Sequence, residues 1–254
     1  NISKEMWGNY GRILSEYPYI SNFRKGDLDK YIKIENKEKL QSETNCLIIA
    51  NHSSHMDVFL MLIANKKPFM FVGKKELYSI PLFGYIYKRA AIMVDRSDPK
   101  SRFAVYGRAN EMLKRGYNVC IFPEAHYWDD TVLLQEFKRG AFKIAIDNNL
   151  PIIPLVFFDL KLKHPWYPKF GSLGKLRVKV LDKIYVDGLS EDDIPMLTKK
   201  AFNLIKGELE NDPKKAAVTA TEKWKKIFLT FKVYDGKIGF SHQMVFETCS
   251  YCMA

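Results

Sequence analysis

The segment Asn-His-Ser-Ser-His-Met-Asp, residues 51–57, holds the titratable side chains of this chain that could do chemistry. An apolar run typical of a buried strand (46–50) precedes it, and an apolar run typical of a helix follows. A strand-to-helix turn can bring the Asp57 carboxylate back to the His52 imidazole. A carboxylate on one ring nitrogen fixes the tautomer and leaves the other nitrogen to take a proton. The spacing therefore predicts a general base.

Two other interpretations of this segment stay open at the level of sequence. Its serines and aspartate would cap the following helix, with both histidines satisfied locally. Alternatively, His52, His55 and Asp57 would bind a metal ion in a hydrolase. A zinc site needs three or four ligands, and the three other histidines of the chain show no recognised metal spacing. We therefore predict no metal and no cofactor.

Strand-like and helix-like segments alternate along most of the chain. Strands are predicted at 31–35, 46–50, 68–73, 91–96, 118–124, 151–159 and 176–186, and helices at 53–65, 100–115, 136–149 and 190–210. This order predicts an α/β three-layer sandwich with a mixed, largely parallel central sheet flanked by helices. Residues 51–57, 94–96 and 122–124 each follow a strand. Because sites in such sheets gather at the carboxyl ends of strands, we expect these three segments to form one site.

Four blocks of the sequence resemble, in the right order, those of the glycerolipid acyltransferases. Residues 51–57 resemble the family signature NHxxxxD, and residues 74–96 are similar to the second block of bacterial lysophosphatidic acid acyltransferases. Ile-Phe-Pro-Glu-Ala at 121–125 resembles the third block, usually Phe-Pro-Glu-Gly. Residues 137–156 resemble the fourth, with its Pro-Ile-Ile-Pro strand. The resemblance covers roughly residues 45–185.

The resemblance implies acyl transfer from acyl-CoA or acyl-carrier protein to the free hydroxyl of lysophosphatidic acid. His52 would be the general base and Asp57 its orienting partner, while backbone amides of the strand-to-helix turn would stabilise the oxyanion. The acceptor site would be organised by Glu124. The remaining candidates are cations for the acceptor phosphate: Lys74 or Lys75, Arg96, and, unless they are only solvated helix charges, Lys138 and Arg139.

The third block departs from the family pattern in ways that bear on activity. Ala125 stands where glycine is expected, and glycine tolerates positive φ and close backbone approach better than alanine. His126, Tyr127 and Trp128 follow, where the family often has an arginine, and two aspartates come next. An inactive lipid-binding relative is therefore an alternative. A second is a lauroyl-type lipid A acyltransferase, which the stretch Asn-Tyr-Gly-Arg near the N-terminus faintly resembles.

Composition and charge extend these expectations to the whole chain of 254 residues. We predict an N-terminal amphipathic helical segment (1–40), an acyltransferase catalytic domain (41–210) and a basic, aromatic C-terminal tail (211–254). The net charge of +11 favours an anionic partner, and 14% aromatic residues suit a membrane interface. No nucleic-acid motif and no run of roughly 18 apolar residues occurs. We expect a peripheral protein at the cytoplasmic face of the cell membrane, with no nucleic-acid partner.

Overall fold

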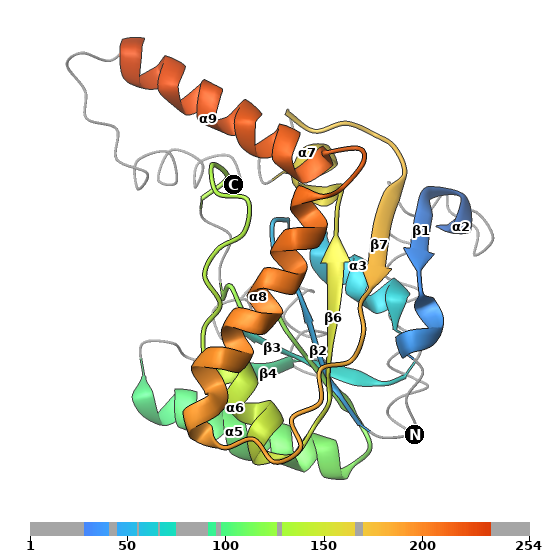
Figure 1. The fold of residues 1–254 in the computed structure, drawn as a ribbon, viewed down its shortest axis with the longest axis vertical. Coiled ribbons are helices and arrows are strands. Elements are labelled where there is room, and N and C mark those ends of the chain that lie inside the picture. The colour runs from blue at the N-terminus through green and yellow to red at the C-terminus, as the bar shows by residue number, and fades with distance from the viewer. Residues whose placement is uncertain are drawn as a thin grey trace, which may run out of the picture.

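The computed structural model describes residues 28–40, 45–54, 56–65, 67–74, 91–94, 98–125, 129–165 and 170–234 (Figure 1). Its strands are β1 Ile32–Glu35, β2 Leu47–Ala50, β3 Phe69–Lys74, β4 Ala91–Val94, β5 Asn118–Ile121, β6 Ile152–Phe157 and β7 Leu176–Val180. Its helices are α2 Leu28–Tyr31, α3 Asp57–Ala64, α5 Pro99–Lys114, α6 Gly140–Asp147, α7 Leu160–Lys163, α8 Ile194–Glu210 and α9 Ala216–Tyr234, with 3₁₀ turns at Lys37–Leu40 and Glu191–Asp193. Residues 1–27 of the predicted N-terminal amphipathic helical segment (1–40) lie outside the described residues.

The seven strands form one mixed sheet in the order β1-β7-β6-β2-β5-β3-β4. All neighbouring strands in this order run parallel except β6 and β7, which pair antiparallel. The predicted mixed, largely parallel sheet is therefore confirmed. The order also makes β6, β2 and β5 neighbours, so the segments that follow these three strands meet at one edge of the sheet.

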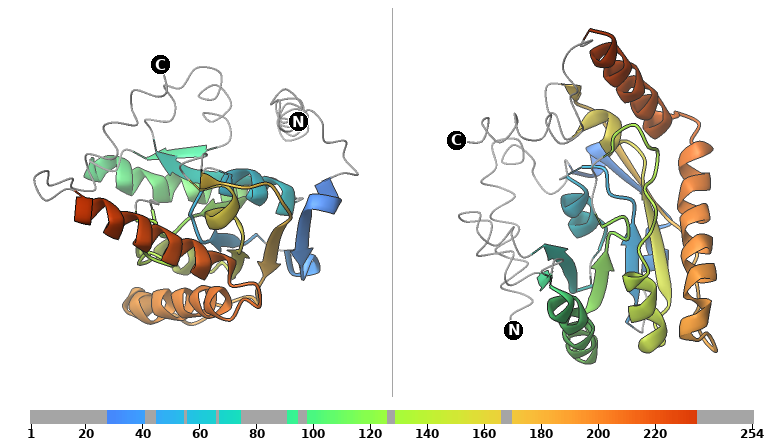
Figure 2. Two further views of the ribbon diagram at one scale, coloured as in Figure 1. Left: turned by 90° about the horizontal axis from the view of Figure 1, so that it is seen from above. Right: turned by 90° about the vertical axis from the view of Figure 1, so that its left-hand side faces the viewer.

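Strand β2 is central because its four residues are apolar and fully buried. Leu47 and Ile49 join the core on one face, where α5, α6 and α8 contribute most of the helical side chains. Ile48 and Ala50 join the core on the opposite face, under α3. Helices α3 and α8 accordingly lie on opposite sides of the sheet in both views of Figure 2. Burial on two faces is what turns a continuous apolar run into a parallel core strand.

Two predicted helix starts are wrong, and in both cases hydrogen bonds of the preceding segment account for the difference. The helix predicted from 136 begins at Gly140, because residues 129–139 form a loop. This loop is hydrogen-bonded to the segment that follows β5, where Lys138 N donates to Pro123 O. The helix after β2 begins at Asp57 and has no side-chain cap. Instead, Ser54 Oγ accepts the N–H of Met56 within the preceding turn.

The described part of the predicted C-terminal tail contains the long helix α9. Helix α9 packs its buried Trp224 edge-on against the Phe170 ring, with 5.3 Å between ring centroids. Of the described helices, none combines the length and the apolar character needed to cross a bilayer. Residues 1–27 and 235–254 lie outside the described ranges, so the division into three segments stays a prediction.

A buried ion cluster joins β7 to the segments that lead into α7 and α9. Arg177 bonds Asp159 at 2.7 Å and Asp212 at 2.5 Å, and its side chain is 14% exposed. The two carboxylates are only 4% and 1% exposed. Hydrogen bonds from Arg177 and from two backbone amides overcome the effect of burial and lower the pKa of Asp212 to about 2. Both carboxylates depend on one guanidinium for their charge partner.

Replacing Arg177 with methionine should destabilise the fold by about 3–5 kcal/mol, because it leaves two buried carboxylates without their cation. The matched control is Arg115→Met, which removes an exposed pair with Glu111 on α5 and should cost less than about 1 kcal/mol. Urea unfolding of both variants measures the difference. Equal losses of unfolding free energy would contradict the cluster's structural role.

Candidate active site

The turn between β2 and α3 places the His52 and Asp57 side chains in direct contact. Asp57 Oδ2 lies 2.8 Å from His52 Nδ1 and also accepts the N–H groups of Ser53 at 2.6 Å and Ser54 at 2.8 Å. The Asp57 side chain has no exposed surface. Three donors on one buried carboxylate oxygen fix its position, so the imidazole orientation is set by the fold of the turn.

The ring of His52 is held on a second side by an aromatic stack. It lies against the Phe122 ring with 4.2 Å between centroids and 14° between planes, and 14% of the His52 side chain is exposed. Nδ1 donates to the carboxylate, which makes Nε2 the ring nitrogen that can accept a proton. The predicted base geometry therefore exists in the structure.

The same turn is anchored at two points, to the last residue of β6 and to the residue that follows α7. Asn51 exchanges two hydrogen bonds with the Phe157 backbone, at 3.0 and 2.8 Å, which extends the pairing of β2 with β6 by one residue. Ser54 Oγ donates to the carbonyl of His164, which follows α7. These bonds fix the segment that carries His52 to its neighbouring strand.

Glu124 is the third acidic or basic side chain that the structure brings to this turn. It is 3% exposed, and its Oε1 accepts the N–H of His52 at 2.5 Å while Oε2 accepts the N–H of Gln135 at 2.7 Å. Burial raises the pKa of Glu124 to about 8, although the two amide bonds and Lys161 act in the opposite direction. With both oxygens bonded to backbone, Glu124 joins the His52 turn to the loop after β5, and its role in an acceptor site stays a prediction.

The expectation that amides of the β2–α3 turn stabilise an oxyanion is wrong for the described amides. Those of Ser53 and Ser54 donate to Asp57, and that of His52 donates to Glu124. The amides of Met56 and Asp57 donate to Ser54 Oγ and Ser54 O. These described amides therefore position His52 and Asp57, whereas the His55 amide of the same turn lies outside the described residues.

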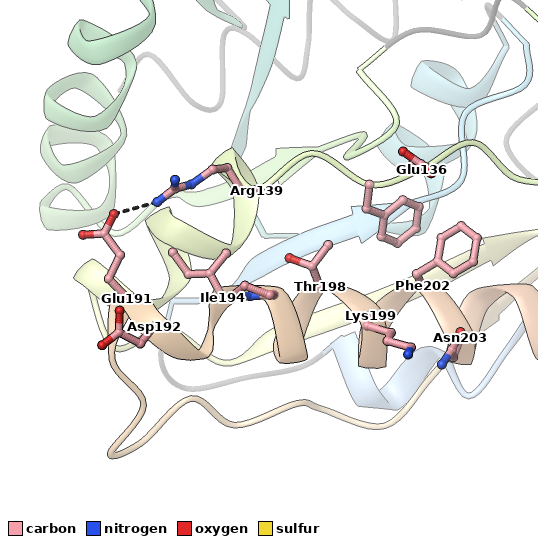
Figure 3. A pocket seen from close by; sticks show the side chains of 11 residues that line it. Glu136, Arg139, Glu191, Asp192, Ile194, Thr198, Lys199, Phe202 and Asn203 are labelled. Carbon is pink, nitrogen blue, oxygen red and sulfur yellow. Dashed lines mark hydrogen bonds and ion pairs between the residues drawn. The ribbon is translucent and has the colours of Figure 1, made fainter.

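Two of the candidate phosphate ligands, Lys138 and Arg139, have described side chains, and within the described part of the chain neither forms a hydrogen bond or ion pair with His52 or Asp57. Arg139 Nη2 bonds Glu191 Oε1 at 2.7 Å, at one end of an open groove of about 830 Å³ between the start of α6 and helix α8 (Figure 3). Lys138 is exposed. Both side chains are exposed, and their contact with the acceptor phosphate stays a prediction. Lys75, Arg96 and the Lys74 side chain lie outside the described parts, so their roles stay predictions.

Sequence reasoning missed three residues that support the centre. Phe122 stacks on the base, Gln135 binds Glu124 through its backbone, and Lys161 is a buried cation that acts on Glu124. Phe122 lay inside the recognised third block, where its ring could have been suspected as a neighbour of His52. Lys161 stands in Leu-Lys-Leu-Lys, a pattern that gives no sign of which lysine is buried.

Ala125 occupies the left-handed region of backbone space, with φ of +66°. Its N–H closes a turn on the carbonyl of Phe122 at 3.0 Å, directly after Glu124. The turn for which the family uses glycine is therefore formed with alanine, at a cost of roughly 1–2 kcal/mol in the left-handed conformation.

Replacing Ala125 with glycine should stabilise the fold by about 0.5–1 kcal/mol, because relief of strain exceeds the added freedom of the unfolded chain. Ala104→Gly, at an exposed position inside α5, is the matched control and should destabilise by a similar amount. Thermal or urea unfolding gives both values. A loss of stability at both positions would contradict the strain assigned to Ala125.

Glu124 should make the stability of the protein depend on pH. Its pKa is raised from 4.5 to about 8, so between these values the folded protein holds a proton that the unfolded chain releases. The contribution of this group to stability is therefore present at low pH and is lost as pH rises towards about 8. In Glu124→Gln, the unfolding free energy should fall less between about pH 5 and about pH 8.5 than in the unsubstituted protein. Parallel stability profiles would contradict the raised pKa.

The fold is thus a layered α/β sheet that carries a hydrogen-bonded histidine–aspartate pair at the carboxyl edge of its strands. Residues 31–158, half of the chain, match the model of the protein family described as Acyltransferase. The chain belongs to this acyltransferase family. The spacing of His52 and Asp57 is that of the family signature that the sequence resembles.

Individual relatives agree with this assignment. The chain is 28% identical over 167 residues to human 1-acyl-sn-glycerol-3-phosphate acyltransferase beta, covering 65% of this chain and 60% of the relative. It is 29% identical over 188 residues to a probable 1-acyl-sn-glycerol-3-phosphate acyltransferase of Mycoplasma pneumoniae, covering 67% and 64%. The chain thus spans about 60% of the length of the curated relatives it matches.

A solved structure shows the same fold. The crystal structure of the 1-acyl-sn-glycerophosphate acyltransferase from Thermotoga maritima superposes with a TM-score of 0.60 at 20% sequence identity. The match covers 82% of this chain and 93% of that one. The likeness extends beyond the matched family region and includes most of the described sheet and helices.

Proposed function

We propose that this protein is a 1-acylglycerol-3-phosphate O-acyltransferase. It moves a fatty acyl group from acyl-CoA or acyl-carrier protein to the free hydroxyl of lysophosphatidic acid. The observation that carries the proposal is the bond of 2.8 Å between His52 Nδ1 and a fully buried Asp57 that three N–H groups hold in place. The names of the relatives supply the substrate class.

The chemistry follows from the orientation of the base. Nε2 of His52 removes the proton of the acceptor hydroxyl while the hydroxyl oxygen forms a bond to the thioester carbonyl carbon. The carbon–sulfur bond then breaks, and the imidazolium returns its proton to the departing thiolate. Asp57 stabilises the imidazolium between the two proton transfers. A thioester is already activated, so this sequence needs no metal ion.

The acceptor phosphate is assigned to cations by similarity to the family. Arg96, with Lys74 or Lys75, is the set that the second block provides. A planar guanidinium binds phosphate through two parallel hydrogen bonds, which makes Arg96 the principal candidate. The net charge of +11 supports an anionic substrate and a peripheral position at the cytoplasmic face of the cell membrane.

The alternatives left open by the sequence receive less support from the site. Among the described residues, which do not include His55, no three His, Cys, Asp or Glu side chains are grouped so that they could hold a metal ion. The formed turn at Ala125 argues against an inactive lipid-binding relative, because the substitution has not displaced the Glu124 carboxylate from His52. The glycerolipid names of the relatives favour that group over a lauroyl-type enzyme.

His52→Ala should lower turnover by about 10²–10⁴-fold, since it removes the base while leaving the loop bonds of Asp57 to Ser53 and Ser54. The assay is product formation from labelled acyl-CoA or acyl-carrier protein and lysophosphatidic acid in mixed vesicles. The matched control is Asp187→Asn. Asp187 is an exposed side chain that accepts a hydrogen bond from Asn149 and is distant in sequence from His52. Its turnover should equal that of the unsubstituted protein.

Unfolding curves of both variants establish that each is folded at the assay temperature. Turnover of His52→Ala equal to that of Asp187→Asn would remove His52 from the mechanism. Absence of product from every donor and acceptor pair with the unsubstituted protein would instead overturn the assigned function.

A further inference from the structure

Lys161 is a charged side chain buried beside the candidate centre and absent from every recognised block. It lies in the first turn after β6, in the short helix α7, and is 5% exposed. Lysine is almost never fully buried unless its ammonium has partners, because the charge loses its hydration. The partners of Lys161 therefore define what the residue does.

Those partners lie on the loop that follows β5. Lys161 Nζ donates a hydrogen bond to the Val132 carbonyl. Asp130, Glu124 and Asp129 favour its charged form, whereas burial and Lys225 of α9 oppose it. Burial is the largest of these effects and lowers the pKa of Lys161. The ammonium thus contacts a carbonyl of this loop, and the negative charges of three carboxylates of the same loop favour its charged form.

The same loop returns to the base through Glu124. Gln135 N donates to Glu124 Oε2, Glu124 Oε1 accepts His52 N, and Gln135 Nε2 donates to the carbonyl of Asp129. The chain of contacts runs from α7, after β6, to the loop after β5, and from there to the turn after β2. Since β6, β2 and β5 are neighbouring strands, all three segments meet at one edge of the sheet.

We propose that Lys161 is a positioning residue for the base. Its ammonium holds the loop of residues 129–135 in place and supplies the positive charge that keeps Glu124 bonded to the His52 backbone. It does not touch the reacting atoms. The effect on catalysis rests on the function proposed above, whereas the effect on Glu124 does not.

This role accounts for the two aspartates that follow the third block. Asp129 and Asp130 add negative charge near the site for which an anionic substrate is proposed, and Asp130 is 8% exposed. Lys161 offsets that charge inside the protein. Without it, the buried Asp130 and Glu124 would lose a nearby positive charge, and the loop would lose the hydrogen bond that Lys161 donates to the Val132 carbonyl.

The direct test measures the titration of Glu124 by carbon-13 NMR of the side-chain carboxyl, with Glu124→Gln to assign the signal. Lys161→Met should raise the pKa of Glu124 by about one unit or more above its value of about 8, because an opposing charge is lost. Lys163→Met, two residues on in α7, is the matched control and should leave the titration unchanged. An unchanged Glu124 titration in folded Lys161→Met would overturn the proposal.

A second variant separates the charge from the hydrogen bond and guards against a Lys161→Met protein that does not fold. Lys161→Gln keeps an N–H donor for Val132 O but removes the positive charge, so Glu124 should titrate higher here as well. A residue that only supports the fold would lower stability without moving this titration. Normal titration in Lys161→Gln would therefore also count against the proposal.

Activity adds an independent readout. Lys161→Met should lower kcat by roughly tenfold or more with little change in KM for the donor, because substrate contacts remain. In a Glu124→Gln background, the same change should cost less than about twofold, since both residues act through one contact. Losses that multiply in the double variant would overturn the link. If the unsubstituted protein forms no product, only the proposed function is refuted. The Glu124 titration then still decides whether Lys161 positions Glu124.

Discussion

One buried oxygen, Oδ2 of Asp57, sets the geometry on which the candidate centre depends. It gathers the imidazole of His52 and the amides of Ser53 and Ser54 at 2.6–2.8 Å. A carboxylate without solvent contact must be satisfied by such donors, so the β2–α3 turn has little choice of conformation. The constraint that stabilises the turn is the same one that orients the base.

The surrounding sheet provides a rigid frame that holds the β2–α3 turn in this conformation. Strand β2 is buried on both faces, and Asn51 extends its pairing with β6 beyond the last strand residue. Glu124 closes the other side by accepting the amide of His52. The turn that carries the base is thus fixed from both neighbouring strands, which is the preorganisation that proton transfer needs.

The sequence was sufficient for the α/β class and for the pairing of His52 with Asp57, because both depend on local patterns. Apolar runs identified the strands, and a fixed spacing within one turn identified the pair. The start of α6 at Gly140 was not predictable, since long-range bonds to Pro123 and Glu124 hold residues 129–139 out of the helix. Lys161 escaped for the same reason: its burial follows from a loop folded over α7.

The most direct test of the central claim is nitrogen-15 NMR of the His52 imidazole in the neutral form. The bond to Asp57 predicts that Nδ1 carries the proton and Nε2 has the chemical shift of an unprotonated nitrogen. In Asp57→Asn, the proton should move to Nε2, because the amide no longer offers a carboxylate oxygen. A protonated Nε2 in the unsubstituted protein would contradict the assignment of His52 as a base held by Asp57.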